Sequence, residues 1–146
     1  MRAGLAADDA GVIENGMIVI EGDRITGVHD ATTVKMAFPE GTRFIDASGK
    51  TIMPGLVDAH AHGAYGVGDL IPQQNWALLQ DLALGVTTIH NPSSQASTVF
   101  AAADRQRAGL TTGPRIFSTG EIIYGAKAPD VYARIDSYED ALAHVR

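Results

Sequence analysis

The sequence contains no cysteine among its 146 residues. Disulfide bonds, thiolate metal sites and cysteine nucleophiles are therefore excluded, and any metal ion must be held by imidazole or carboxylate groups. The chain also lacks an apolar run of ~18 residues, the length of a membrane span, and its first residues have no apolar stretch of signal-peptide length. We therefore expect no membrane role, and the cytoplasm is the favoured location.

Basic residues are few. The chain has 11 Lys and Arg against 17 Asp and Glu, a net charge of −6. This balance lacks the basic patch expected of a nucleic-acid binder and argues against binding to anionic membranes. Charged residues make up 19% and hydrophobic residues 45% of the chain, which is typical of a globular protein rather than a disordered one. We expect neither a nucleic-acid nor a membrane partner.

Residues 1–52 predict a small, partial β-sandwich-like domain. A Gly22-Asp23 turn joins predicted strands at 17–21 and 24–29, a hairpin pattern. A second short pair of strands is predicted at 43–46 and 50–53. These strands are too few to build a convincing core of their own.

Residues 53–146 predict alternating strands and helices, which is typical of parallel strands with crossover helices. Trp76 and Phe100 lie on apolar helical stripes and are predicted to be core residues. Asp136, with Glu139 three residues later, predicts the start of a third helix. The predicted strands are 56–60, 86–90 and 115–119, and the first two predicted helices are 73–84 and 97–108.

Three parallel strands leave both edges of a sheet bare, and a complete (β/α)8 barrel needs ~250 residues. We therefore expect an α/β chain that is the amino-terminal part of a larger enzyme. It would hold a small β-sandwich-like unit followed by the first three β/α units of an incomplete TIM-type barrel. The alternative is a natural small domain that closes its sheet by forming a homo-oligomer.

The sequence Asp58-Ala59-His60-Ala61-His62 is the motif that carries chemistry. Residues i and i+2 of a strand point to the same side, ~6.5 Å apart, so two imidazoles at this spacing can converge on one ion. Asp58 lies one step earlier on the same face, where its carboxylate can orient a ligand. The alternative is a pair of surface histidines at a strand end.

The segment 45–62, IDASGKTIMPGLVDAHAH, resembles the signature that enters the first barrel strand of the amidohydrolase superfamily. Residues 12–16 and 20–25 resemble the small β-sandwich of that superfamily. Residues 85–88, GVTT, are similar to the second barrel strand of its imidazolonepropionase-like branch. The resemblance covers nearly the whole chain and implies that His60 and His62 are metal ligands.

The resemblance also implies one or two divalent ions, most often Zn²⁺, in a (β/α)8 barrel. The family completes its His-x-His pair with a Lys or Glu from the fourth strand, histidines from the fifth and sixth, and an Asp from the eighth. That Asp usually acts as the catalytic base. All these positions are expected beyond Arg146, so the 146 residues alone are expected to be inactive and to bind metal poorly.

Four further residues follow predicted strand ends and are candidates for substrate contact at the rim of the same site. They are Tyr65, His90, Glu121 and Tyr124. For His90 the alternative is a solvated loop histidine. His29 and His144 are predicted to be surface groups.

The leading hypothesis is therefore a metal-dependent hydrolase that acts on C–N bonds of a small-molecule amide, cyclic amide or peptide. A bound metal ion lowers the pKa of its water toward ~7, which supplies hydroxide at neutral pH. The alternative is a non-catalytic assembly or interaction module derived from such an enzyme, in which the histidine pair binds metal weakly or not at all.

Overall fold

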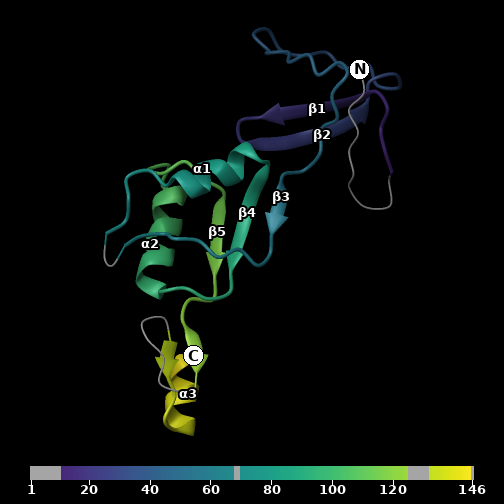
Figure 1. The fold of residues 1–146 in the computed structure, drawn as a ribbon. Helices are drawn as coiled ribbons and strands as arrows, with labels where there is room; N and C mark the ends of the chain where they lie inside the picture. The colour runs from purple at the N-terminus through teal and green to yellow at the C-terminus, as the bar shows by residue number, and fades with distance from the viewer. Residues whose placement is uncertain (1–10, 68–69, 125–131, 146) are drawn as a thin grey trace. The chain divides into compact units, whose positions relative to one another are not determined.

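A computed structural model describes residues 11–67, 70–124 and 132–145. The chain divides into two compact units, Met1–Pro54 and Gly55–Arg146. Figure 1 shows a hairpin in the first unit, and a sheet with helices in the second. The predicted α/β class is confirmed. None of the helices within the described ranges is long and apolar enough to cross a membrane.

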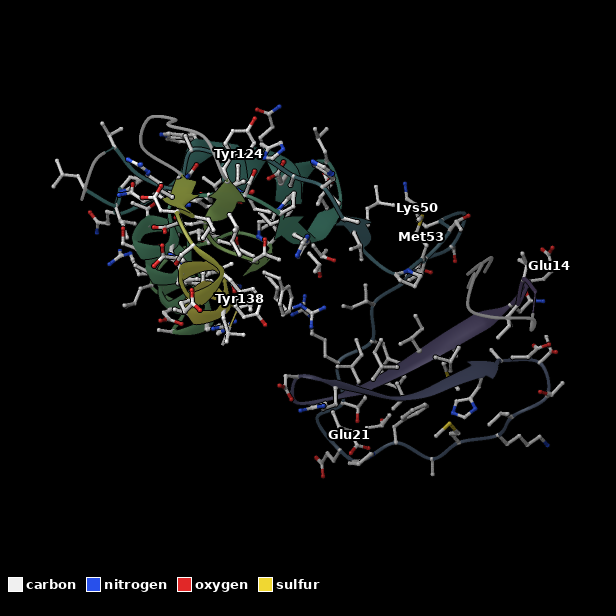
Figure 2. The ribbon with its side chains drawn as sticks, turned by 90° about the horizontal axis from the view of Figure 1, so that it is seen from below. Glu14, Glu21, Lys50, Met53, Tyr124 and Tyr138 are labelled. Carbon is white, nitrogen blue, oxygen red and sulfur yellow. The ribbon has the colours of Figure 1, made fainter. Side chains whose placement is uncertain are left out.

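The first unit contains an antiparallel hairpin. Strand β1 (Gly16–Glu21) pairs with β2 (Arg24–Asp30), with a register shift between Val19 and Ile20. Figure 2 shows Glu21 at the end of β1, where the chain turns back. Gly22 adopts a φ of +62° in this turn, a conformation that glycine tolerates without steric cost. The predicted hairpin is confirmed.

The second strand pair predicted in this unit is wrong. Residues 43–46 and 50–53 form no strand, and the described part of the unit contains one two-stranded sheet rather than a sandwich. The carboxylate of Asp46 instead accepts the backbone N–H of Ser48 at 2.9 Å, and Lys50 donates to the carbonyl of Ala47 at 3.0 Å. These bonds close a local turn, and the residues on either side of it are not paired as strands.

The second unit is built on a parallel sheet. Its strands β3 (Leu56–Asp58), β4 (Val86–Asn91) and β5 (Arg115–Ser118) lie in the order β3-β4-β5. Helix α1 (Trp76–Ala83) connects β3 to β4, and α2 (Ala96–Arg107) connects β4 to β5. Both helices lie on the same side of the sheet (Figure 1). The carboxyl ends of the three strands therefore share one edge.

Helix α1 begins three residues later than predicted, because Asn75 caps it. The Asn75 side-chain oxygen accepts the backbone N–H groups of Ala77 at 3.0 Å and Leu78 at 3.4 Å. The helix ends before Gly85, whose φ is +90°. The side-chain amide of Asn75 also donates to the carbonyl of Ala64 at 2.7 Å, which ties the loop after β3 to the start of the helix.

The core lies between the sheet and the two helices. Ile89 and Ile116 from the strands pack with Leu78 from α1 and with Val99 and two alanines from α2. The prediction that Trp76 and Phe100 are core residues is wrong, because these side chains are 80% and 46% exposed. The sheet covers the helix faces that carry Leu78 and Val99 instead.

A second strand pair and a third helix follow β5. Strands β6 (Ile122–Tyr124) and β7 (Tyr132–Arg134) are parallel, and the sequence did not predict them. Helix α3 (Tyr138–His144) is capped by Ser137, whose hydroxyl accepts the N–H of Asp140 at 3.0 Å, and not by Asp136 as predicted. Figure 2 labels Tyr124 and Tyr138 in this part of the second unit.

Candidate metal centre

The histidine pair lies just beyond the carboxyl end of β3. The strand ends at Asp58, two residues earlier than predicted. The carboxylate of Asp58 accepts the backbone N–H of His60 at 3.0 Å, which bends the main chain into a turn. Strand alternation therefore does not align His60 and His62, as the sequence had suggested. The Asp58 side chain fixes the backbone of His60 instead.

The two imidazoles nevertheless converge. The Nε2 atoms of His60 and His62 are 3.2 Å apart, and the ring planes meet at 75°. Both side chains are exposed. Two nitrogen ligands of one tetrahedral zinc ion, each ~2.1 Å from the metal, lie roughly 3.4 Å apart. The donor type and the spacing of the pair therefore fit a shared divalent ion.

A hydrogen bond between the two rings is the other arrangement that this distance allows. It requires one Nε2 to carry a proton and the other to carry a lone pair. A shared ion requires lone pairs on both Nε2 atoms, with the protons on Nδ1. The two arrangements thus differ in the position of one proton, which is measurable.

The pair has no third protein ligand within the part of the chain that the structure describes. No group of three or more His, Asp or Glu side chains there is placed to hold one ion. Two imidazoles leave a tetrahedral ion short of two ligands. Binding by these residues alone is therefore expected to be weak.

His90, at the end of β4, contacts the turn that carries His60. Its Nδ1 lies 3.3 Å from the carbonyl oxygen of Ala59, and its own carbonyl accepts the N–H of Ala61 at 2.9 Å. The side chain is half-buried. His90 is thus one of the four residues predicted to contact substrate, and it lies in direct contact with the turn that carries the histidine pair.

Tyr65 lies in the core rather than on an open rim. Its side chain is 3% exposed, and its hydroxyl makes no hydrogen bond to the described residues. Burial raises the pKa of Tyr65 above its ordinary value. The nearby Asn91 side chain lowers this pKa by a smaller amount, although the two side chains do not have hydrogen-bond geometry. Asn91 is itself 1% exposed and was not predicted as part of this region.

Replacing Tyr65 with phenylalanine is expected to raise the free energy of unfolding by about 1 kcal/mol, because an unpaired buried hydroxyl is removed. The folded state holds the Tyr65 proton more tightly than the unfolded state does. The protonated Tyr65 therefore contributes to the free energy of unfolding. That contribution is fully present below pH ~10 and is lost as the pH rises through the pKa of the folded state. The variant should lose less stability in that alkaline range.

Urea denaturation at neutral and alkaline pH measures both effects. Tyr138→Phe is the matched control, because Tyr138 is 75% exposed, and it should change neither quantity. A Tyr65→Phe variant less stable than the wild type at neutral pH would show that the hydroxyl has a stabilising partner.

Glu121 and Tyr124 both follow the end of β5 at Ser118, as the sequence suggested. Glu121 is exposed and lines a shallow hollow with Phe100 and Ile123. Tyr124 ends β6 and is 50% exposed, and its carbonyl accepts the N–H of Ile135 at 3.2 Å. A role for either residue in substrate contact stays a prediction.

No model of a known protein family matches the chain. The chain is 43% identical over 60 residues to an imidazolonepropionase of Fusobacterium nucleatum, and 38% identical over 73 residues to one of Chloroflexus aggregans. These matches cover 40% and 50% of this chain, but 14% and 17% of those proteins. The matched segment is therefore less than a fifth of the length of these curated relatives.

Three solved structures resemble the chain over most of its length. A protein assigned as a prolidase from Bifidobacterium longum has a TM-score of 0.70 and 27% identity, over 99% of this chain and 36% of that one. Molinate hydrolase has a TM-score of 0.64 and 27% identity, over 97% and 35% of the two chains. An amidohydrolase has a TM-score of 0.59 and 25% identity, over 93% and 36%.

These relatives and structural neighbours confirm that the chain resembles the amidohydrolase superfamily. Enzymes of this superfamily generally use a divalent metal ion. Both histidines of the candidate centre belong to the segment that carries the resemblance.

Proposed function

We propose that this chain is the amino-terminal portion of a metal-dependent hydrolase that cleaves C–N bonds, and that His60 and His62 hold its divalent ion. The observation that carries the proposal is the convergence of the two Nε2 atoms to 3.2 Å. Zinc is the first candidate, because its tetrahedral geometry suits imidazole ligands at this spacing. When bound, the ion would activate a water molecule and polarise the carbonyl under attack.

The position of the pair in the sheet supports the proposal. His60 and His62 directly follow the carboxyl end of β3, and the sheet is parallel. Active sites of barrels of parallel strands are built at this edge. In the proposed arrangement, β3, β4 and β5 are the first three strands of a (β/α)8 barrel. The remaining metal ligands and the catalytic base would come from strands outside this chain.

Residues of this chain fix the backbone around the two proposed ligands. Asp58 holds the N–H of His60, and Ala61 donates to the carbonyl of His90. These contacts fix the main chain on which both imidazoles stand, before any metal binds. Such preorganisation lowers the cost of placing ligands around an ion.

The substrate class follows from the chemistry and from the relatives. An ion held by His60 and His62 would supply hydroxide at neutral pH and polarise a carbonyl, which is chemistry that suits amide bonds. The relatives are named for imidazolonepropionase, prolidase and molinate hydrolase activities. We therefore propose a small-molecule amide, cyclic amide or peptide as the substrate.

Metal removal tests this function. The complete gene product is expected to hydrolyse a panel of cyclic amides and Xaa-Pro dipeptides, and dialysis against a chelator should lower the rate at least about 100-fold. Added Zn²⁺ should restore it, and the same protein dialysed without chelator is the control. Hydrolysis that survives removal of all bound metal would contradict the proposal.

A second candidate, a non-catalytic assembly module, rests on the exposed apolar strand at the sheet edge. Leu56 and Val57 of β3 are 48% and 65% exposed, and β3 has one neighbouring strand in the described sheet. A bare edge of this kind can pair with another chain. This candidate predicts no hydrolysis of the panel with or without bound metal, so the same experiment separates the two functions.

A further inference from the structure

We propose that His90 is a positioning residue for the His60–His62 pair, and that it acts through an Nδ1–H donated to the carbonyl of Ala59. This role differs from the substrate contact expected at that position. It rests on the proposed function in so far as the pair holds a metal ion. The contact itself is independent of any metal.

The contacts of His90 lie on both sides of His60. The His90 ring reaches the carbonyl of Ala59 at 3.3 Å, and the His90 carbonyl accepts the N–H of Ala61 at 2.9 Å. Asp58 holds the N–H of His60 itself at 3.0 Å. Three hydrogen bonds therefore fix three successive residues of the turn, and two of them come from His90.

The turn needs this support because it lies outside the strand ladder. Strand β3 ends at Asp58, and both metal-ligating side chains are exposed. His90 offers a rigid base, since its neighbours Ile89 and Asn91 are 2% and 1% exposed. A buried strand thus anchors an exposed turn, and the turn sets the 3.2 Å spacing of the two Nε2 atoms.

The partner of the His90 ring determines its tautomer. A carbonyl oxygen only accepts hydrogen bonds, so the His90 Nδ1 facing Ala59 must carry the proton in the neutral ring. The lone pair is then on Nε2. This assignment is a spectroscopic signature that a purely space-filling role for His90 would not require.

Two amide substitutions separate the hydrogen bond from the bulk of the ring. Asparagine places its amide near the position of Nδ1, so His90→Asn retains a donor to Ala59. Glutamine places its amide near the position of Nε2, so His90→Gln loses that donor. The residue retains its main-chain bond to Ala61 in both variants.

Titration with Zn²⁺ alone, followed by the imidazole resonances of His60 and His62, measures the effect. We expect His90→Gln to weaken zinc binding about 10-fold and His90→Asn to stay within about threefold of the wild type, because residues that orient ligands typically change affinity by 10- to 100-fold. Equal affinities for the two variants would overturn the positioning role.

The tautomer of wild-type His90 is the second measurement, and it needs no substitution. Long-range ¹H–¹⁵N correlation on the neutral ring should show the proton on Nδ1. A proton on Nε2 would overturn the proposal. If His90 shows the Nδ1–H form but Zn²⁺ leaves His60 and His62 unaffected, the proposed metal site fails while the contact to Ala59 stands.

Discussion

Replacing His60 with alanine is expected to lower the zinc affinity of the chain at least about 100-fold, because one of its two imidazole ligands is lost. His62→Ala should have the same effect, since the Nε2 atoms of the two rings lie 3.2 Å apart and both face the ion in the proposed site. The double variant should bind zinc more weakly than either single variant, because neither imidazole remains. Calorimetric titration with Zn²⁺ measures all three.

Two other histidines provide matched controls. His29 lies on β2 in the first unit, and His144 is the last residue of α3 and is exposed. Alanine at either position should leave zinc affinity unchanged. An equal loss at His144 would indicate non-specific binding by surface imidazoles.

The absolute affinity of the wild-type chain is also informative. Two ligands leave a tetrahedral ion incomplete, so we expect weak binding. Tight binding at one ion per chain would contradict the two-ligand account. Tight binding at one ion per two chains would mean that two histidine pairs share the ion, and the molar mass would then double on adding zinc.

Replacing Ile89 with alanine is expected to lower the free energy of unfolding by about 2–5 kcal/mol. Ile89 is 2% exposed and lies in the middle strand, where it packs in the core with Ile116 and Val99. The core is small, so the cavity removes a large share of its contacts. A loss of this size is a large fraction of the stability of an ordinary domain.

Urea denaturation followed by circular dichroism measures the loss. Ile25→Ala is the matched control, because Ile25 is 65% exposed, and it should change the free energy of unfolding by no more than about 0.5 kcal/mol. A loss at Ile89 as small as the loss expected at Ile25 would contradict the placement of the core between the sheet and the helices. His90 follows Ile89 directly on β4. Under conditions in which the Ile89→Ala variant is partly unfolded, it should therefore also bind zinc more weakly.

The hairpin and the parallel sheet were predictable because their signals are local. The turn at Gly22 and the strand pattern around it predicted β1 and β2. Gly85 predicted the end of α1. The second strand pair of the first unit was not predictable in this way. Asp46 closes the turn with a side-chain hydrogen bond, but a turn signal alone does not determine whether the flanking residues pair as strands.

The core was predicted less well, because a helical stripe does not say which of its residues a sheet will cover. Trp76 and Leu78 are two residues apart on α1, yet the first is 80% exposed and the second 4%. The strands β6 and β7 are three residues each, too short to give a clear periodic signal.

The candidate ligands were predictable from residue type and spacing, but their geometry was not. The sequence placed His60 and His62 on an extended strand, whereas a turn held by Asp58 brings them together. The role of His90 depends on a contact to Ala59, 31 residues earlier in the chain. Only the pairing of β3 with β4 brings these residues together.

The most direct test of the metal centre is the ¹⁵N spectrum of the five histidines during a titration with Zn²⁺. We predict that the Nε2 resonances of His60 and His62 shift together along one saturation curve, with both protons on Nδ1, while those of His29 and His144 stay in place. Separate curves for the two rings, or a proton retained on either Nε2 at saturation, would contradict a shared ion.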